Sequence, residues 1–242
     1  MHAAEPAPAP KTETATEETA PAEALTEALK KLQLPGIVIN PKERFVDVQA
    51  TVCLDDGSLE LIACTKDTKE HESIIMVEAS PVHIHTALLL LGAKNGTPAM
   101  RRPLNEELTR WQDVPPSGDP IDVFLVWKNE KGEEIERPIS DFIMRSEEEQ
   151  ITPEPDKDKE KFPHTFLFAG SQLSDPSDTP RKYAADYSGH VISISAFGDE
   201  VLCLSEVYSQ ENGSLQWQID STHLPKLHSK VSLRLRVKKI QP

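Results

Sequence analysis

The residues best suited to chemistry in this chain are gathered in the segment Thr68–Gly96, which reads TKEHESIIMVEASPVHIHTALLLLGAKNG. Five polar residues stand together near its start: Lys69, Glu70, His71, Glu72 and Ser73. A short apolar run follows, and then a stretch with two more histidines, His83 and His85. Ammonium, carboxylate and imidazole groups bind ions, exchange protons and contact partners, so Lys69–Ser73 and His85 form the candidate site.

Three interpretations of this site are open. On a strand, His71 and Ser73 would share one face, so a metal held by His71 would need ligands from elsewhere. His85 could supply one if the strand and the following helix pack antiparallel, but a zinc site normally needs three or four ligands. A hydrogen-bonded cluster that fixes the strand entry, or a surface for a ligand or partner, needs no such set. We therefore predict no cofactor, with a divalent metal at His71 and His85 as the alternative.

Signals for catalysis are weak. Ser73 and His71 lie two residues apart on one strand face, roughly 7 Å, which is too far for a direct hydrogen bond. The Ala169-Gly170-Ser171 sequence lacks the GxSxG elbow of hydrolases. The chain also lacks a glycine-rich phosphate loop. We favour a non-enzymatic protein and keep a hydrolase as the weakest option.

The frame around the site includes one clear helix. Ser80 is a good N-cap, Pro81 suits the first helical position, and Gly92 suits the left-handed position after the last turn. These signals predict a helix over residues 81–91. Its side chains are apolar nearly all round, so we expect it to be buried on more than one side.

Most of the remaining pattern predicts strands. Residues 44–53 and 230–237 alternate apolar and polar side chains. Asp55–Ser58 should turn residues 44–53 into a hairpin with 59–64, and a second hairpin should join 123–127 to 134–137. We expect a short helix over 105–111 and another, N-terminal one over 22–32. The predicted fold is α+β, with mainly antiparallel strands and one buried helix.

Composition divides the chain into three parts. Residues 1–21 are rich in Pro, Ala, Thr and Glu and should be disordered. Residues 22–242 should form a single domain, interrupted by an acidic loop over 146–161. The start, Met-His-Ala-Ala-Glu, is typical of a mature exported protein whose signal peptide has been removed.

Charge and cysteine content narrow the function classes. The net charge of −14 argues against nucleic acid as a partner. The longest apolar run is far shorter than the roughly 18 residues of a transmembrane helix. The three cysteines, Cys53, Cys64 and Cys203, have no C-x-x-C spacing. The predicted hairpin register does not place Cys53 opposite Cys64, so one disulfide and three buried thiols both remain open.

Several segments together resemble a known family. They are Leu34–Ile37, Val52–Leu54, Leu59-Glu60, Ala63-Cys64, Lys69–Ser73, Ala87–Gly92, Phe168–Ser171, Asp186–Gly189 and Ile192–Phe197. This combination, and the K-E-H-E-S string above all, is similar to the YdjY-type domain of envelope-associated bacterial proteins, common in planctomycetes. The resemblance implies export without implying a reaction. We therefore expect a periplasmic or secreted binding module, whose partner is a protein or small ligand of the cell envelope.

Overall fold

The structure is a computed structural model that describes residues 32, 34–105, 107–146, 161–175, 177–208 and 216–238. The expected tail over 1–21, the expected helix over 22–32 apart from residue 32, and residues 147–160 of the acidic loop lie outside these residues. The first strands are β1 (Ile37–Asn40), β2 (Phe45–Val52), β3 (Leu61–Thr65), β4 (Ser73–Val77), β5 (Met100–Pro103), β6 (Trp111–Val114) and β7 (Pro120–Lys128). The later ones are β8 (Glu134–Pro138), β9 (Ile143–Arg145), β10 (Thr165–Leu167), β11 (His190–Ser195), β12 (Leu202–Tyr208), β13 (Trp217–Ile219) and β14 (Lys230–Val237).

The fold is β-rich, so the prediction of an α+β fold with a buried helix is wrong. In the described residues, the α-helices are α2 (Pro81–Leu90) and the single turn α4 (Ala185–Ser188). Two short 3₁₀ turns, η1 (Glu70–Glu72) and η2 (Ile139–Phe142), complete the helical part. Strands carry most of the core, and loops, α2 and η2 supply the other buried apolar residues of the same cluster.

The large sheet closes on itself. Its strands pair in the order β2, β14, β7, β10, β12, β11, β3, β4, and β4 pairs back onto β2. β1 pairs with the first half of β2 and β8 pairs with β7. The pairs β3–β4 and β11–β12 are parallel, so the sheet is mixed. Because closure joins the outermost strands, β2 and β4 do not leave an open edge between them.

Alternation explains the buried face of this sheet. Val48 of β2 lies opposite Leu233 of β14, which lies opposite Leu125 of β7, and all three are fully buried. On the other face of the same strands, Arg234 lies opposite Asp47. Apolar residues on one side and polar residues on the other are what a strand with one buried face requires. The predicted alternation over 230–237 is confirmed.

The two predicted hairpins have different outcomes. β7 and β8 form the expected antiparallel hairpin. The hairpin between residues 44–53 and 59–64 is wrong, because β4 lies between β2 and β3 and pairs with both. A turn signal such as Asp56-Gly57 indicates where the chain changes direction, but it does not determine which strand pairs with β2.

The helix α2 begins at Pro81 as predicted and packs against β1, β2 and α4. Its N-terminus is capped from far along the chain: Asp186 Oδ1 accepts hydrogen bonds from the Val82 N–H at 3.0 Å and the Ser80 hydroxyl at 2.8 Å. One side of the helix is buried, whereas Leu89 is exposed. Burial on more than one side is therefore a wrong prediction. In the part of the chain that the structure describes, no helix has the length and apolar character needed to cross a membrane.

Candidate functional site

The Lys69–Ser73 segment forms the crossover between the parallel strands β3 and β4. The 3₁₀ turn η1 occupies Glu70–Glu72, and Ser73 begins β4. Lys69 Nζ lies 2.9 Å from Glu72 Oε2 and 3.5 Å from Glu60 Oε2. A single ammonium group therefore bridges a carboxylate of the crossover and a carboxylate that immediately precedes β3.

Glu60 and Glu72 titrate as a pair. Burial raises the pKa of Glu60, and a hydrogen bond with Glu72 raises it further. Burial also acts to raise the pKa of Glu72, but hydrogen bonds from Glu60 and Lys69 outweigh it and bring this pKa below its ordinary value. The two carboxyl groups therefore differ in acidity, with the pKa of Glu60 above its ordinary value and the pKa of Glu72 below it.

The other residues of the segment differ in their exposure. Ser73 is fully buried, and its hydroxyl donates to the Lys69 carbonyl oxygen at 2.8 Å. Glu70 accepts a hydrogen bond from a backbone N–H of the preceding turn. His71 Nε2 lies 3.1 Å from Glu72 Oε1, and the His71 side chain is 70% exposed. Most of these polar groups thus hold the crossover together, and His71 is the one that solvent reaches most easily.

Two thiols adjoin the buried end of this segment. Cys53 Sγ donates to the Ser73 carbonyl oxygen at 3.2 Å. The pKa of Cys64 is lowered to about 7, mainly by a hydrogen bond with the Cys53 thiol. The same hydrogen bond raises the pKa of Cys53. Cys53, Cys64 and Cys203 are all free thiols in this structure. Cys64 is therefore the thiol that ionises first.

His85 lies in α2 and has different neighbours. Its Nδ1 is 2.8 Å from the hydroxyl of Tyr183, which in turn donates to the Gly170 carbonyl oxygen at 3.0 Å. The rings of His85 and Phe168 meet edge to face, with 4.8 Å between their centroids. Burial lowers the pKa of His85, so the imidazole is neutral at neutral pH.

The structure does not bring His71 and His85 together. They lie beyond opposite ends of the five-residue strand β4, and each contacts a different partner. Over the ranges that the structure describes, no group of three or more His, Cys, Asp or Glu side chains is arranged to hold a metal ion. The described residues therefore offer a metal ion no set of three ligands, and they keep the two candidate histidines apart.

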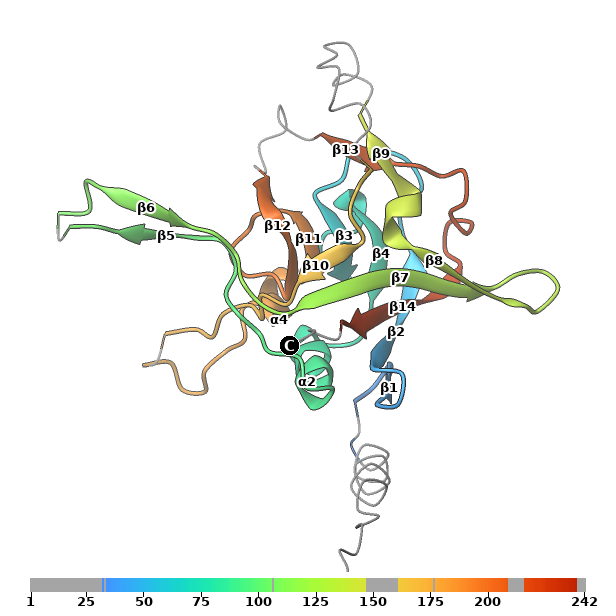
Figure 1. Cartoon of the computed structure of the whole chain (residues 1–242), viewed down its shortest axis with the longest axis horizontal. Helices are drawn as coiled ribbons and strands as arrows, with labels where there is room; N and C mark the ends of the chain where they lie inside the picture. The colour runs from blue at the N-terminus through green and yellow to red at the C-terminus, as the bar shows by residue number, and fades with distance from the viewer. Residues whose placement is uncertain are drawn as a thin grey trace, which may run out of the picture. The chain divides into compact units, whose positions relative to one another are not determined.

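A projecting hairpin, here called the arm, is formed by β5, β6 and the tip between them (Figure 1). Its two strands pair with each other and form a sheet of their own. Three large apolar side chains of the arm are exposed: Leu104 at 52%, Leu108 at 56% and Trp111 at 44%. The expected short helix over 105–111 is absent from the described residues of this stretch, which form the tip and the start of β6.

The base of the arm is fixed to the body. Ser117 donates its backbone N–H to the Thr97 carbonyl oxygen at 2.9 Å, and the Thr97 N–H donates to the Ser117 hydroxyl at 3.1 Å. Gly118 has φ +138°, and a Cβ atom there would lie 2.1 Å from the Phe168 carbonyl oxygen. Only glycine allows this close approach, so the arm leaves the body in a defined direction.

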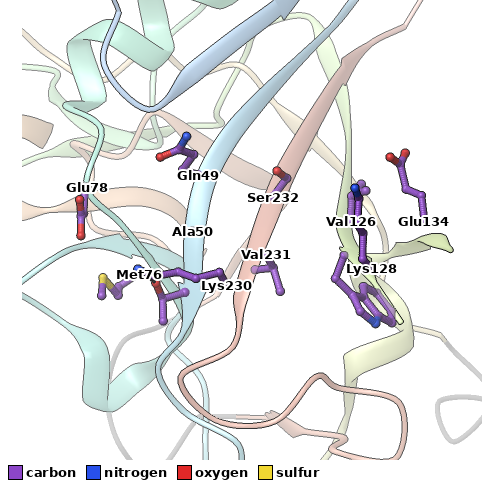
Figure 2. A pocket seen from close by; sticks show the side chains of 12 residues that line it. Gln49, Ala50, Met76, Glu78, Val126, Lys128, Glu134, Lys230, Val231 and Ser232 are labelled. Atoms are coloured by element: carbon purple, nitrogen blue, oxygen red, sulfur yellow. Dashed lines mark hydrogen bonds between the residues drawn. The ribbon is translucent and has the colours of Figure 1, made fainter. Parts of the chain in front are cut away.

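A groove of about 650 Å³ crosses the polar face of β2, β14 and β7 (Figure 2). Glu78 lies at one end and Glu134 at the other, with Lys230 between them. The ammonium group of Lys230 donates to the Thr51 hydroxyl at 3.0 Å. The groove therefore presents charges of both signs and has no concentrated positive or negative field.

Sequence reasoning missed several residues of these regions. Glu60 reaches Lys69 through the pairing of β3 with β4, and Tyr183 reaches His85 through the packing of α2, so neither partner could be read from the local sequence. The arm did carry a signal, because Arg102-Pro103 and Trp111 flank a short polar stretch with one Asn. That pattern also suits a short helix, which is what we expected over residues 105–111.

Comparison with known proteins gives one match. A family model described as "YdjY domain" matches residues 37–236. The chain therefore belongs to the YdjY domain family, which confirms the resemblance drawn from the K-E-H-E-S string and its companions. No curated protein and no solved structure matches the chain.

Proposed function

We propose that this YdjY-domain protein is a non-enzymatic binding module of the bacterial cell envelope, and that it binds a partner protein through the arm. The observation that carries the proposal is the exposure of Leu104, Leu108 and Trp111 on one ordered hairpin. Apolar side chains clustered on a projecting element are costly to hydrate, and they are common where proteins dock. Tryptophan and arginine are also the residues that dominate binding energy at interfaces.

The arm is organised before any partner arrives. Asn105 Oδ1 accepts hydrogen bonds from the backbone N–H groups of Thr109 at 3.1 Å and Arg110 at 3.0 Å. The Trp111 indole N–H donates to the Leu108 carbonyl oxygen at 3.0 Å. These bonds fix the tip, so a partner would lose less free energy in ordering it on binding.

Backbone strain at the tip supports the same proposal. Leu108 has φ +55°, a left-handed conformation that is unfavourable for a bulky residue. Such strain costs on the order of 1–3 kcal/mol and persists only where the surroundings enforce it. The side chain of this residue is 56% exposed at the tip and is available to a partner.

The charges of the arm indicate the chemistry of the partner. Arg101 pairs with Asp113 at 3.2 Å across the hairpin. Arg102 and Arg110 are exposed and have no salt bridge to any residue in the described part of the chain. We expect a partner with an apolar cleft rimmed by carboxylates, because such a cleft would take the Leu and Trp side chains and pair with the two arginines.

Location in the periplasm or outside the cell is part of the proposal. It rests on the envelope association that the resemblance to the YdjY domain family implies. The Lys69–Ser73 segment then has a supporting role, because its polar groups largely pair with one another and hold β3 parallel to β4. His71 remains available as an additional contact.

The proposal is tested by comparing two double variants in capture experiments from envelope extracts. Leu108→Ser with Trp111→Ser removes the apolar tip, whereas Val38→Ser with Val207→Ser removes two apolar side chains elsewhere that are at least as exposed. We expect all proteins to melt alike and only the arm variant to lose a specific, saturable partner. Equal capture by both variants, with melting unchanged, would count against the arm as the binding surface.

A further inference from the structure

A cavity of about 520 Å³ opens beside His85, apart from the arm and the Lys69–Ser73 crossover. Its lining combines the apolar side chains of Val82 and Leu173 with the polar ones of His85, Asn95, Arg181 and Tyr183. Cavities of this size, mostly apolar and with a few convergent polar groups, are typical of small-molecule sites.

The hydrogen bonds at His85 determine which ring nitrogen carries the proton. The Tyr183 hydroxyl has one hydrogen, and it goes to the Gly170 carbonyl oxygen, which can only accept. The hydroxyl oxygen must therefore accept from His85, so Nδ1 carries the proton of the neutral ring. In this tautomer Nε2 of His85 carries the lone pair, and the His85 ring belongs to the lining of the cavity.

Arg181 supplies a fixed cation at the same cavity. Its Nε and Nη2 both donate to the Ser174 carbonyl oxygen, at 3.2 and 3.0 Å. Neither bond uses Nη1, and the Asp175 carboxylate, whose pKa is lowered by its own hydrogen bonds with Ser177 and further by this guanidinium, lies beyond salt-bridge distance. A positioned arginine beside a partly apolar wall favours a carboxylate ligand.

The lining of the cavity includes a glycine. Gly170 has φ +84°, and a Cβ atom there would lie 2.6 Å from the Asn95 Cβ atom. The Gly170 carbonyl also accepts the Tyr183 hydroxyl that orients His85. The same backbone position therefore shapes the cavity and sets the polarity of its histidine.

We propose that this cavity binds a small organic carboxylate with a hydroxyl group on an apolar body. The carboxylate pairs with Arg181, the hydroxyl donates to Nε2 of His85, and the body packs against Val82 and Leu173. The site is separate from the arm, so it can exist whether or not the arm binds a partner.

The test uses para-hydroxyphenylacetate as the probe and calorimetric titration of the full chain. Wild type should bind it saturably at millimolar concentrations or below. Arg181→Gln should weaken binding by about tenfold or more, because a charge-assisted hydrogen bond is lost. Arg137→Gln, which removes an arginine of β8 that pairs with Asp141, is the matched control and should leave the affinity unchanged.

The histidine is tested with a second probe, phenylacetate, which lacks the hydroxyl group. It should bind wild type more weakly than the first probe, and His85→Phe should remove this difference while the melting curve shows a folded protein. Two results would overturn the proposal: no saturable binding of para-hydroxyphenylacetate, or equal binding by wild type and Arg181→Gln.

Discussion

Lys69 Nζ lies 2.9 Å from Glu72 Oε2, and this ion pair spans the crossover that makes β3 and β4 parallel. Glu60 lies on the other side of the same ammonium group, at 3.5 Å. The folded state holds the pKa of Glu72 below its ordinary value. The ionised Glu72 carboxylate therefore stabilises the folded state at pH values above its ordinary pKa. This stabilisation is lost as the pH falls through the lower pKa of the folded state.

Replacement of Lys69 tests this arrangement. Lys69→Met leaves two neighbouring carboxyl groups without their cation, so we expect the free energy of unfolding to fall by about 1–3 kcal/mol at neutral pH. The loss should shrink toward about pH 4, where carboxyl groups take up protons. Urea denaturation at both pH values measures this. Lys131→Met, in the exposed turn after β7, is the control, and an equal loss in both variants at neutral pH would contradict the account.

The thiol pair predicts an unusual titration. Because the Cys53 thiol lowers the pKa of Cys64 to about 7, the native protein should show a thiolate absorbance step near that pH. Burial raises the pKa of Cys203 to about 12, so this residue should not contribute to the step. Cys64→Ser should abolish the step and Cys53→Ser should move it to higher pH. A step that persists in Cys64→Ser would show that another group is responsible.

His85 makes stability depend on pH. Burial lowers its pKa from the ordinary value of 6.5, so the unfolded chain takes up a proton before the folded one does. Stability should therefore decline as pH falls through 6.5 toward the folded-state value. His85→Gln should flatten this part of the profile, measured by melting across a pH series. An unchanged profile in the variant would refute the assignment.

Arg234 should be the most costly single residue of the polar sheet face. It donates to Asp47 through Nε at 2.7 Å and Nη2 at 2.8 Å, and to Glu136 through Nη1 at 2.6 Å. Arg234→Leu removes the bidentate partner of Asp47 and leaves Glu136 with its second pair, to Arg236 at 2.9 Å, and we expect a loss of about 3–5 kcal/mol in urea denaturation. Arg137→Leu breaks only the more exposed pair with Asp141 and should cost about 0–1 kcal/mol. Similar losses in the two variants would be the contrary result.

Local signals in the sequence predicted local structure well. The Ser80-Pro81 start and Gly92 end gave the place of α2, and alternation gave β2 and β14. The fold class could not be derived in the same way, because closure of the sheet depends on β4 pairing with both β2 and β3. No short-range sequence pattern determines that β4, and not β3, pairs with β2.

The candidate site, like the fold, could be predicted from the sequence only where its residues are close together in the chain. Lys69, Glu72 and Ser73 stand near one another in the sequence and in space, so the cluster could be predicted in part. Glu60 joins it only because the parallel pairing returns the chain beside its own start. His85 meets Tyr183 across 98 positions of the chain, a relationship set by the packing of α2 against the body.

Photo-crosslinking in the envelope tests the central claim most directly. A photoreactive amino acid at position 108, at the tip of the arm, should give one discrete adduct with a partner protein in living cells. The same group in place of Tyr187, which is 65% exposed on the body, should give none. Adducts of equal yield and pattern from both positions, or no adduct from position 108, would contradict the claim that the arm is the binding surface.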